Sequence, residues 1–374
     1  MNMNREAQQQ FNDVIDQMAL VYKHDSRPWM IGFSGGKDST LLCQLTFEML
    51  EQLSPEERTK KIYIVTSDTM VENPIVKSYM HRMKDAINAV SKEKRLPVEA
   101  HIIYPEVKNR FWSLVIGLGY PTPEAPGFRW CTERLKILPS NAFTYDVIKK
   151  DGEIVILLGV RKAESSTRAR SISSREIEGK ILTPHDSIPK AYVFSPLASI
   201  GNEYVWEYLL KDGGMSAWNT DNSYLFSLYQ GEDLGEEQSV IGEVDKDKIA
   251  ITGNSRFGCW CCTMVKEDKS LKNFIDHGAT QLIPLREFRN EIAELRKNPD
   301  ARDYRRRNGA VYFMKNGDLG RGPFTLETRM YMLRRLLKLE EETGFELISL
   351  EELKYIDKVW EKEGDLSCRA VVDI

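Results

Sequence analysis

The 374-residue sequence contains no uninterrupted apolar stretch close to the roughly 18 residues that a membrane-spanning helix needs. Its polar N-terminus also lacks the apolar core of a secretory signal peptide. Repeats and low-complexity segments are missing, and a composition of 41% hydrophobic and 29% charged residues is typical of a globular protein. These absences exclude the membrane-spanning, fibrous and disordered classes, and we expect a cytoplasmic protein with no membrane partner.

A strong excess of positive charge is missing too, because 52 lysines and arginines stand against 56 acidic residues and the formal net charge is −4. Any nucleic-acid binding therefore has to come from a local basic patch. The six cysteines do not have the spread of a disulfide framework, since three of them stand between positions 259 and 262. We therefore expect free thiols in a reducing compartment.

Apolar runs that alternate with helical patterns predict an α/β fold, with a parallel twisted sheet that carries helices on both faces. The organisation predicted from these patterns is a sheet domain at 1–212, an acidic insertion with a cysteine-containing loop at 213–265, and a mostly helical C-terminal region at 266–374. We expect strands at 29–33, 62–65, 100–103 and 154–158, intervening helices at 41–53, 75–94 and 135–149, and later helices near 281–296, 326–342 and 350–362.

The segment Ser34-Gly35-Gly36-Lys37-Asp38-Ser39 lies between the first predicted strand and the first predicted helix. A glycine turn in that place aims backbone N–H groups and the positive end of the helix dipole at an anion. Two glycines allow a close approach, the serines add hydroxyl donors, and the lysine adds a charge. We therefore predict a phosphate site, whereas the alternative interpretation is an ordinary glycine turn. The spacing differs from that of the Walker loop.

Ligands of parallel α/β sheets bind at the carboxyl ends of the strands. Asp68 follows the second predicted strand, and Gly159 and Arg161 follow the fourth, so we place them with the phosphate loop. Lys37 and Asp38 are expected on an exposed loop, where substitution would leave the fold intact.

The cysteines are the second informative feature. Cys259 and Cys262 have the two-residue gap with which one loop presents two thiolates to one metal centre, and Cys131 precedes a predicted helix. The alternative is that these thiols are small buried side chains. Zinc would need four firm ligands, and no histidine stands within five residues of a cysteine, so an iron–sulfur cluster suits the pattern better. Cys43 is expected in the core of the first helix.

The hexapeptide resembles the PP-loop of the ATP pyrophosphatases, which split ATP between its α and β phosphates. Over roughly residues 29–265 the chain is similar to the adenylyl-sulfate and phosphoadenylyl-sulfate reductase branch of that superfamily, whose fold is adenine nucleotide alpha hydrolase-like. The resemblance rests on Ser67 to Pro74, on Gly159 to Arg168, on Ser195-Pro196-Leu197 with Val205 to Leu209, on Trp130-Cys131-Thr132, and on Gly258 to Thr263.

Two departures from the reductases change the expected function. The first cysteine site holds one cysteine, Cys131, instead of two, and the nucleophilic cysteine near the C-terminus is missing, since Cys368 has a different context. A closer resemblance is to the DndC family, the sulfurtransferase and ATP pyrophosphatase of DNA phosphorothioation systems. It rests on residues 120–132, Pro139-Ser140-Asn141, and the tail around Tyr304 to Arg307.

This resemblance implies an enzyme that binds ATP and Mg²⁺, adenylylates a DNA backbone phosphate and mediates sulfur transfer. It implies phosphate contacts from Ser34, Gly35, Gly36, Lys37 and Ser39, nucleotide contacts from Asp68 and Gly159, and a Mg²⁺ contact from Asp38. The implied catalytic residues are Lys37, Asp38, Arg161 and Arg168. The implied ligands of a [4Fe–4S] cluster are Cys131, Cys259 and Cys262. The cluster could be catalytic or purely structural.

The implied partners are DNA, a cysteine desulfurase as sulfur donor and other subunits of a phosphorothioation system. Two alternatives stay open, an adenylyl-sulfate reductase and a non-catalytic ATP-binding scaffold. The basic segments that could contact DNA are the loop 165–175 and the tail arginines Arg302, Arg305, Arg306, Arg307, Arg321, Arg334 and Arg335.

Overall fold

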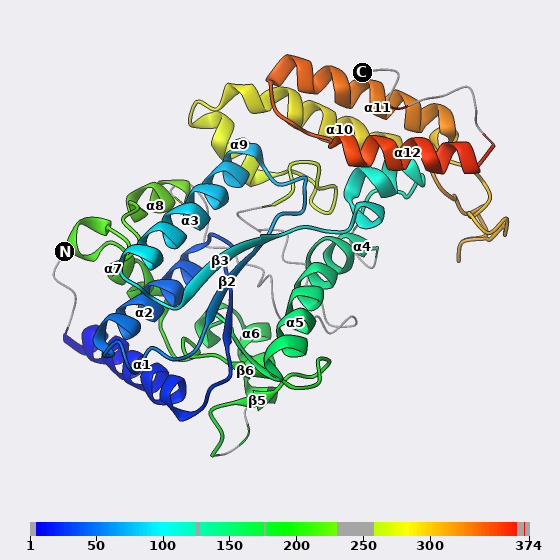
Figure 1. Cartoon of the computed structure of the whole chain (residues 1–374). Helices are drawn as coiled ribbons and strands as arrows, with labels where there is room; N and C mark the ends of the chain where they lie inside the picture. The colour runs from blue at the N-terminus through cyan, green and yellow to red at the C-terminus, as the bar shows by residue number, and fades with distance from the viewer. Residues whose placement is uncertain are drawn as a thin grey trace. The chain divides into compact units, whose positions relative to one another are not determined.

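The structure is a computed structural model that describes residues 5–124, 128–175, 177, 179–229, 258–364 and 370 (Figure 1). The chain divides into two compact units that interleave along the sequence. We call residues 1–67, 75–103 and 137–257 the sheet unit, and residues 68–74, 104–136 and 258–374 the helical unit. The consecutive domain boundaries at 212/213 and 265/266 stay a prediction, and the acidic part of the predicted insertion lies outside the described residues.

A six-stranded sheet forms the centre of the sheet unit and confirms the predicted fold class. Its order is β3-β2-β1-β4-β6-β5, and all neighbours are parallel except β5 and β6. In register, Trp29 of β1 lies between Ile62 of β2 and Val155 of β4. The strands are β1 (Trp29–Gly32), β2 (Ile62–Ser67), β3 (Val98–Ile103), β4 (Ile154–Leu157), β5 (Thr183–Pro184) and β6 (Ala191–Phe194).

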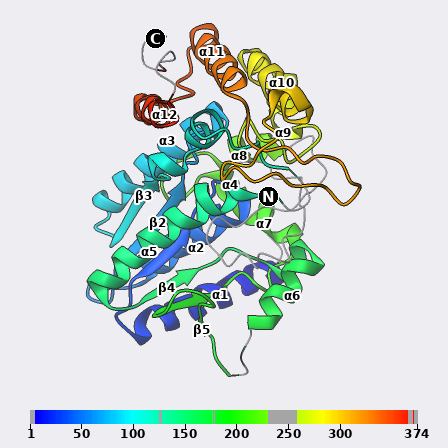
Figure 2. The ribbon, with the colours of Figure 1, turned by 90° about the vertical axis from the view of Figure 1, so that its right-hand side faces the viewer.

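Helices cover both faces of this sheet, which explains why β2 and β4 are buried along their whole length. Right-handed crossovers place α2 and α3 on one face and α5 on the other, as Figure 1 shows on either side of β2 and β3. In the sheet unit α1 packs against α2, and α5 against β2, β3 and β4 (Figure 2). The helices are α1 (Arg5–His24), α2 (Lys37–Gln52), α3 (Pro74–Glu93), α5 (Leu138–Asp151), α6 (Ser166–Arg175), α7 (Asn202–Leu209) and α8 (Asn222–Tyr229).

The helical unit contains the C-terminal helices that the sequence predicts. Thr325 caps α11, and Ser349 forms a capping box with Glu352 at the start of α12. The helices are α4 (Trp130–Thr132), α9 (Lys269–Asp276), α10 (Ile283–Lys297), α11 (Leu326–Thr343) and α12 (Leu350–Lys362). Within the described part of the chain, no helix is long and apolar enough to cross a membrane.

Candidate functional site

The loop between β1 and α2 has the geometry of an anion site. Gly35 has a φ of +77°, and a Cβ there would lie 3.3 Å from the ring of Tyr79, so glycine is needed on both counts. Gly36 is the N-cap of α2 and provides no side-chain cap for its first N–H groups. The Ser34 and Ser39 hydroxyls lie 3.1 Å apart, and Ser39 Oγ donates to Gly36 O at 3.0 Å. The predicted strand, glycine turn and helix are confirmed.

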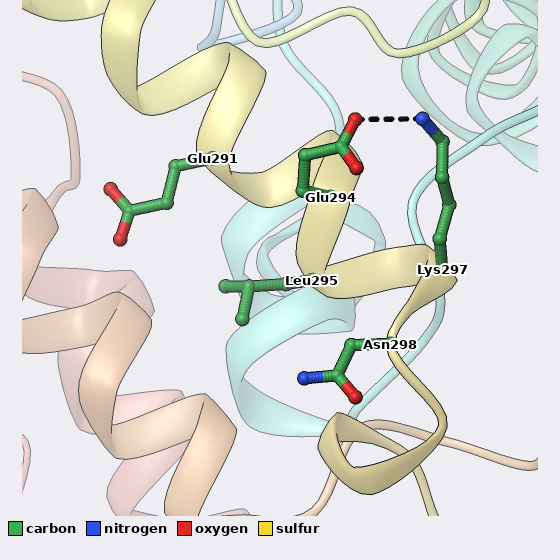
Figure 3. A pocket seen from close by; sticks show the side chains of 5 residues that line it. All are labelled: Glu291, Glu294, Leu295, Lys297 and Asn298. Atoms are coloured by element: carbon green, nitrogen blue, oxygen red, sulfur yellow. Dashed lines mark hydrogen bonds and ion pairs between the residues drawn. The ribbon is translucent and has the colours of Figure 1, made fainter.

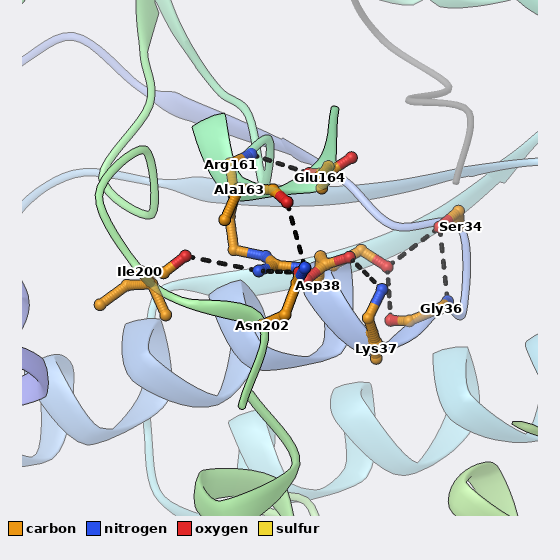
Figure 4. A network of polar contacts seen from close by, with 10 residues as sticks. Ser34, Gly36, Lys37, Asp38, Arg161, Ala163, Glu164, Ile200 and Asn202 are labelled. Carbon is orange, nitrogen blue, oxygen red and sulfur yellow. Dashed lines mark hydrogen bonds and ion pairs between the residues drawn. The ribbon is translucent and has the colours of Figure 1, made fainter. Parts of the chain in front are cut away.

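Asp38 joins two cations in the first turn of α2 (Figure 4). Lys37 Nζ donates to Asp38 Oδ2 at 2.8 Å, and Arg161 Nε donates to Asp38 Oδ1 at 2.5 Å. The side chains of Arg161 and Asp38 are 1% and 4% exposed. The expectation of an exposed loop for Lys37 and Asp38 is therefore wrong. The Asp38 carboxylate offsets part of the charge of Lys37 and Arg161, and the three groups together keep a net charge of +1, which suits an anion.

Arg161 is held by more than its ion pair. Its Nη1 donates to Asn202 Oδ1 at 2.7 Å and to Ile200 O at 3.4 Å, and its backbone N–H donates to Glu164 Oε1 at 2.7 Å. Sequence reasoning did not assign roles to Glu164 and Asn202. The Arg-x-x-Glu spacing in the sequence could have indicated the contact from Glu164. The contact from Asn202 depends on the fold, and no sequence pattern indicates it.

Gly159 lies directly beyond the end of β4, against the first turn of α2. A Cβ at this position would lie 3.1 Å from the Asp38 carbonyl oxygen. The glycine therefore lets the end of β4 approach α2 closely enough for Arg161 to reach Asp38. Its predicted nucleotide contact stays a prediction.

Two further predicted site residues have different surroundings. Asp68 follows β2, is fully buried in the helical unit, and its Oδ1 accepts from Met70 N at 2.8 Å. That bond makes an Asx turn in which Met70 has a φ of +66°. Arg168 belongs to α6, but its side chain lies outside the described residues.

The cysteine loop of the helical unit is fixed by backbone bonds. Cys262 N donates to Cys259 O at 3.0 Å, which closes a tight turn, and Trp260 N donates to Val71 O at 3.0 Å. Arg289 Nε donates to Cys262 O at 2.8 Å. The turn that presents Cys259 and Cys262 is therefore anchored on the segment after β2 and on α10.

Electrostatic coupling places the three predicted cluster ligands in one neighbourhood. Burial raises the pKa of Cys131, Cys259 and Cys262, the last to about 11, and the charge of Cys131 contributes to the rise at Cys262. Burial lowers the pKa of Lys136, but the charges of Glu72, Cys259, Cys131 and Cys262 raise it overall. The Lys136 ammonium therefore interacts electrostatically with all three thiols.

A short polar chain connects this lysine to Cys259. Lys136 Nζ lies 3.7 Å from Glu72 Oε1, Thr69 Oγ1 donates to the same oxygen at 3.0 Å, and Thr69 Oγ1 lies 3.3 Å from Cys259 Sγ. Burial raises the pKa of Glu72, which is 6% exposed. Sequence reasoning assigned no role to Thr69, Glu72 or Lys136. No local pattern signals the arrangement, because Lys136 and Cys259 stand far along the chain from the segment that holds Thr69 and Glu72.

The donor set suits an iron–sulfur cluster, because it offers three thiols and a cation that offsets their negative charge. Among the side chains that the structure describes, however, no group of three histidine, cysteine, aspartate or glutamate residues is arranged to hold a metal ion. The cluster therefore stays a proposal. Cys43 is fully buried in α2, as expected for a core residue, and Cys368 lies outside the described residues.

A hollow of about 440 Å³ lies beside α10, lined by Glu291, Glu294, Leu295, Lys297 and Asn298 (Figure 3). Lys297 pairs with Glu294 at 2.7 Å, and Glu291 pairs with Arg335 at 3.5 Å. The two carboxylates make this hollow a poor site for a nucleotide, so the loop at α2 is the better candidate.

The chain was compared with protein families, curated proteins and solved structures. No protein-family model matches the chain. An uncharacterized protein of Methanocaldococcus jannaschii is 29% identical over 192 residues, which span 51% of this chain and 33% of that protein. The matched segment thus covers about a third of the relative's length.

Three solved structures are similar, each with a TM-score of 0.34. The phosphoadenylyl-sulfate reductase of Candida auris is 12% identical, and the match covers 63% of this chain and 97% of that one. The U34-tRNA thiolase NcsA of Methanococcus maripaludis, with its [4Fe-4S] cluster, is 12% identical, and the match covers 78% of this chain and 82% of that one. The NH3-dependent NAD synthetase of Campylobacter jejuni is 11% identical, and the match covers 79% of this chain and 97% of that one. At this level of similarity they do not assign a function.

Proposed function

We propose that the protein is an ATP pyrophosphatase and sulfurtransferase that modifies the DNA backbone. The observation that carries the proposal is the uncapped start of α2 behind the glycine turn, with Lys37 and Arg161 anchored by Asp38 beside it. A helix N-terminus with fixed cations suits a polyphosphate, and a rigid arrangement stabilises charge without reorganisation during the reaction.

In the proposed first step, an oxygen of a DNA backbone phosphate attacks the α phosphorus of ATP. The bond from that phosphorus to the bridging oxygen breaks, and pyrophosphate leaves with the electron pair. Ser34, Ser39 and the N–H groups of the turn would hold the leaving pyrophosphate. Asp38 accepts charged hydrogen bonds from Lys37 and Arg161, and the proposed Mg²⁺ contact would add to these ion pairs.

In the proposed second step, hydrosulfide attacks the adenylylated DNA phosphorus, AMP leaves with the activated oxygen, and a proton is released. The protein contributes positioning and charge stabilisation. Cys131, Cys259 and Cys262 would hold a [4Fe–4S] cluster, which when bound could supply an iron site for sulfide. A cysteine desulfurase is the proposed sulfur source: its enzyme-bound persulfide is reduced by a cellular thiol, which ends in a disulfide while hydrosulfide is released. Other phosphorothioation subunits are the proposed partners.

The test follows the products of ATP in the presence of Mg²⁺, DNA and hydrosulfide, because AMP leaves the adenylylated DNA only in the second step. We expect AMP and pyrophosphate in equal amounts from the wild-type protein, and loss of both with Lys37→Ala. The control Lys149→Ala removes an exposed lysine from the last turn of α5 and should leave turnover unchanged. ADP as the only product would contradict the proposal, and no product at all would favour the scaffold.

The DNA product is tested separately in cells that carry the complete system. Mass spectrometry of nuclease-digested DNA should detect sulfur-linked dinucleotides that disappear when this gene is deleted. Their persistence at normal levels would exclude the assignment to DNA. Sulfite release from adenylyl sulfate would instead favour the reductase.

A further inference from the structure

The segment between α10 and α11 forms an extended hairpin, residues 302–324, which we call the arginine arm. Its base is closed by Asp303 N donating to Pro323 O at 2.8 Å, and its tip by Met314 N donating to Asp318 O at 2.8 Å. A Cβ at Gly322 would lie 1.8 Å from the Arg305 carbonyl oxygen, so only glycine lets the two halves of the arm approach this closely. The arm extends away from α10, α11 and α12 in Figures 1 and 2.

Two of the arm's arginines hold it in place. Arg302 Nη2 donates to the carbonyl oxygens of Arg321 and Gly322 at 2.8 and 2.7 Å. Arg307 Nη1 donates to Leu118 O at 2.5 Å and pairs with Glu363 at 2.9 Å. These two guanidinium groups are therefore structural, which removes them from the predicted DNA contacts.

The rest of the arm presents aromatic rings and cations to solvent. Phe313 is 70% exposed and Tyr304 is 45% exposed. Arg306 lies over the Tyr312 ring at 4.0 Å, and Arg305 over the Tyr304 ring at 5.2 Å. An exposed Phe313 contributes little to folding, since burial is what makes an aromatic side chain stabilising.

The positive charge of the arginine arm indicates which kind of ligand fits this surface. The arm contains six basic and two acidic residues, whereas the whole chain has a net charge of −4. A local excess of positive charge favours a polyanion over an ordinary protein surface. Rings that are available for stacking favour unpaired bases, because the faces of paired bases are already stacked within a duplex.

We propose that the arginine arm binds single-stranded or locally unpaired DNA, with bases stacked on Phe313 and Tyr304 and phosphates bound by Arg305, Arg306 and Lys315. This inference deepens the proposed function and rests on it, because it assigns the state of the DNA substrate. Aromatic stacking combined with cations that follow the backbone is the general mode of sequence-tolerant single-strand binding.

The test measures the anisotropy of a labelled oligothymidylate, the corresponding duplex and an oligouridylate with the full-length protein. We expect the single-stranded DNA to bind more tightly than the duplex. Phe313→Ala should weaken single-strand binding about fivefold or more, which is the loss of about 1 kcal/mol of stacking. The matched control is Leu20→Ala, which removes another exposed apolar side chain, 62% exposed on α1.

The electrostatic part is tested by the salt dependence. The double variant R305A/R306A should reduce the slope of log K against log salt by about 1.4, as expected for two phosphate contacts on a single strand. The control K149A/K150A removes the same charge from α5, where both lysines are exposed, and should leave the slope unchanged. Wild-type binding by all arm variants would overturn the proposal, as would binding of the oligouridylate alone.

Failure of the arm and failure of the proposed function are distinguishable. If wild-type cells contain phosphorothioate DNA but Phe313→Ala binds DNA normally, the arm proposal is wrong and the function stands. If Phe313→Ala loses single-strand binding but wild-type cells contain no phosphorothioate, the arm stands as a DNA-binding element and the assigned chemistry is wrong.

Discussion

Replacing Asp38 by alanine tests whether the anchored cations depend on one buried carboxylate. The change removes the acceptor of both Lys37 Nζ and Arg161 Nε. Arg161 would keep two neutral acceptors, Asn202 Oδ1 and Ile200 O, but its guanidinium is 1% exposed and would lose its counter-charge. Breaking a buried ion pair in this way costs about 3–5 kcal/mol. That is a large fraction of the stability of a typical domain, about 5–15 kcal/mol.

A second variant separates the charge effect from a cavity effect. D38A/R161M removes the buried guanidinium together with its partner, so no charge remains uncompensated at position 161. Lys37 loses the carboxylate in both variants, so the two differ only at position 161. We expect the double variant to be more stable than D38A alone, because removing both members of the Asp38–Arg161 pair costs less than breaking it.

The assay is native-state hydrogen exchange without ATP, read at the amides of β1 and β4. Exchange at α11 in the helical unit serves as an internal reference, because it reports on the other compact unit. The control Asp146→Ala removes an exposed carboxylate from α5 and should change stability by less than about 0.5 kcal/mol. A D38A effect below about 1 kcal/mol, or a double variant less stable than D38A, would refute the reasoning.

Two further predictions concern the helical unit and the core. Serine in place of Cys131, Cys259 or Cys262 should lower the iron content of anaerobically purified protein. Cys43→Ser should keep the iron and lower the free energy of unfolding by about 1–3 kcal/mol, because it buries a hydroxyl. Iron retained in all three ligand variants would contradict the ligand set. Burial raises the pKa of Glu352, so the folded state holds this proton to higher pH than the unfolded chain, and stability is lost as the pH rises through the raised pKa. Glu352→Gln should therefore raise the denaturation midpoint more at about pH 8 than at about pH 4, and an equal shift at both pH values would speak against this explanation.

Strands β1 to β4 were predictable because the pattern that indicates each of them lies within a short stretch of the sequence. β1, β2 and β4 are apolar along their length, and helical periodicity separates them, so composition alone indicates a sheet buried on both faces. β5 and β6 were not predicted. β5 has two residues, one of them proline. β6 pairs with β4 in parallel and follows α6, and the expectation of a loop at 165–175 was wrong, so the crossover that leads to β6 was not recognised.

The phosphate loop was predictable for the same local reason, but its charge arrangement was not. The hexapeptide indicates the turn and the helix start, whereas the partner of Asp38 stands 123 positions later in the chain. Only the pairing of β1 with β4 brings the loop after β1 and the loop after β4 to neighbouring positions at one edge of the sheet. Ion pairs between distant segments depend on the order of the strands in the sheet, and a single sequence does not reveal that order.

The same reasoning explains why Lys37 and Asp38 were expected in solvent. A charged dipeptide in a glycine-rich loop is usually exposed, because burying a single charge is costly. Burial becomes tolerable because each charge has a partner of opposite sign, and Asp38 pairs both with Lys37 and with Arg161 from the loop after β4. In the helical unit, the buried Glu72 carboxylate pairs at 3.7 Å with Lys136, whose side chain is 20% exposed, beside the thiols. Both candidate sites therefore contain a buried carboxylate that pairs with a cation from a distant segment. Asp38 and Glu72 are the residues on which the two arrangements depend.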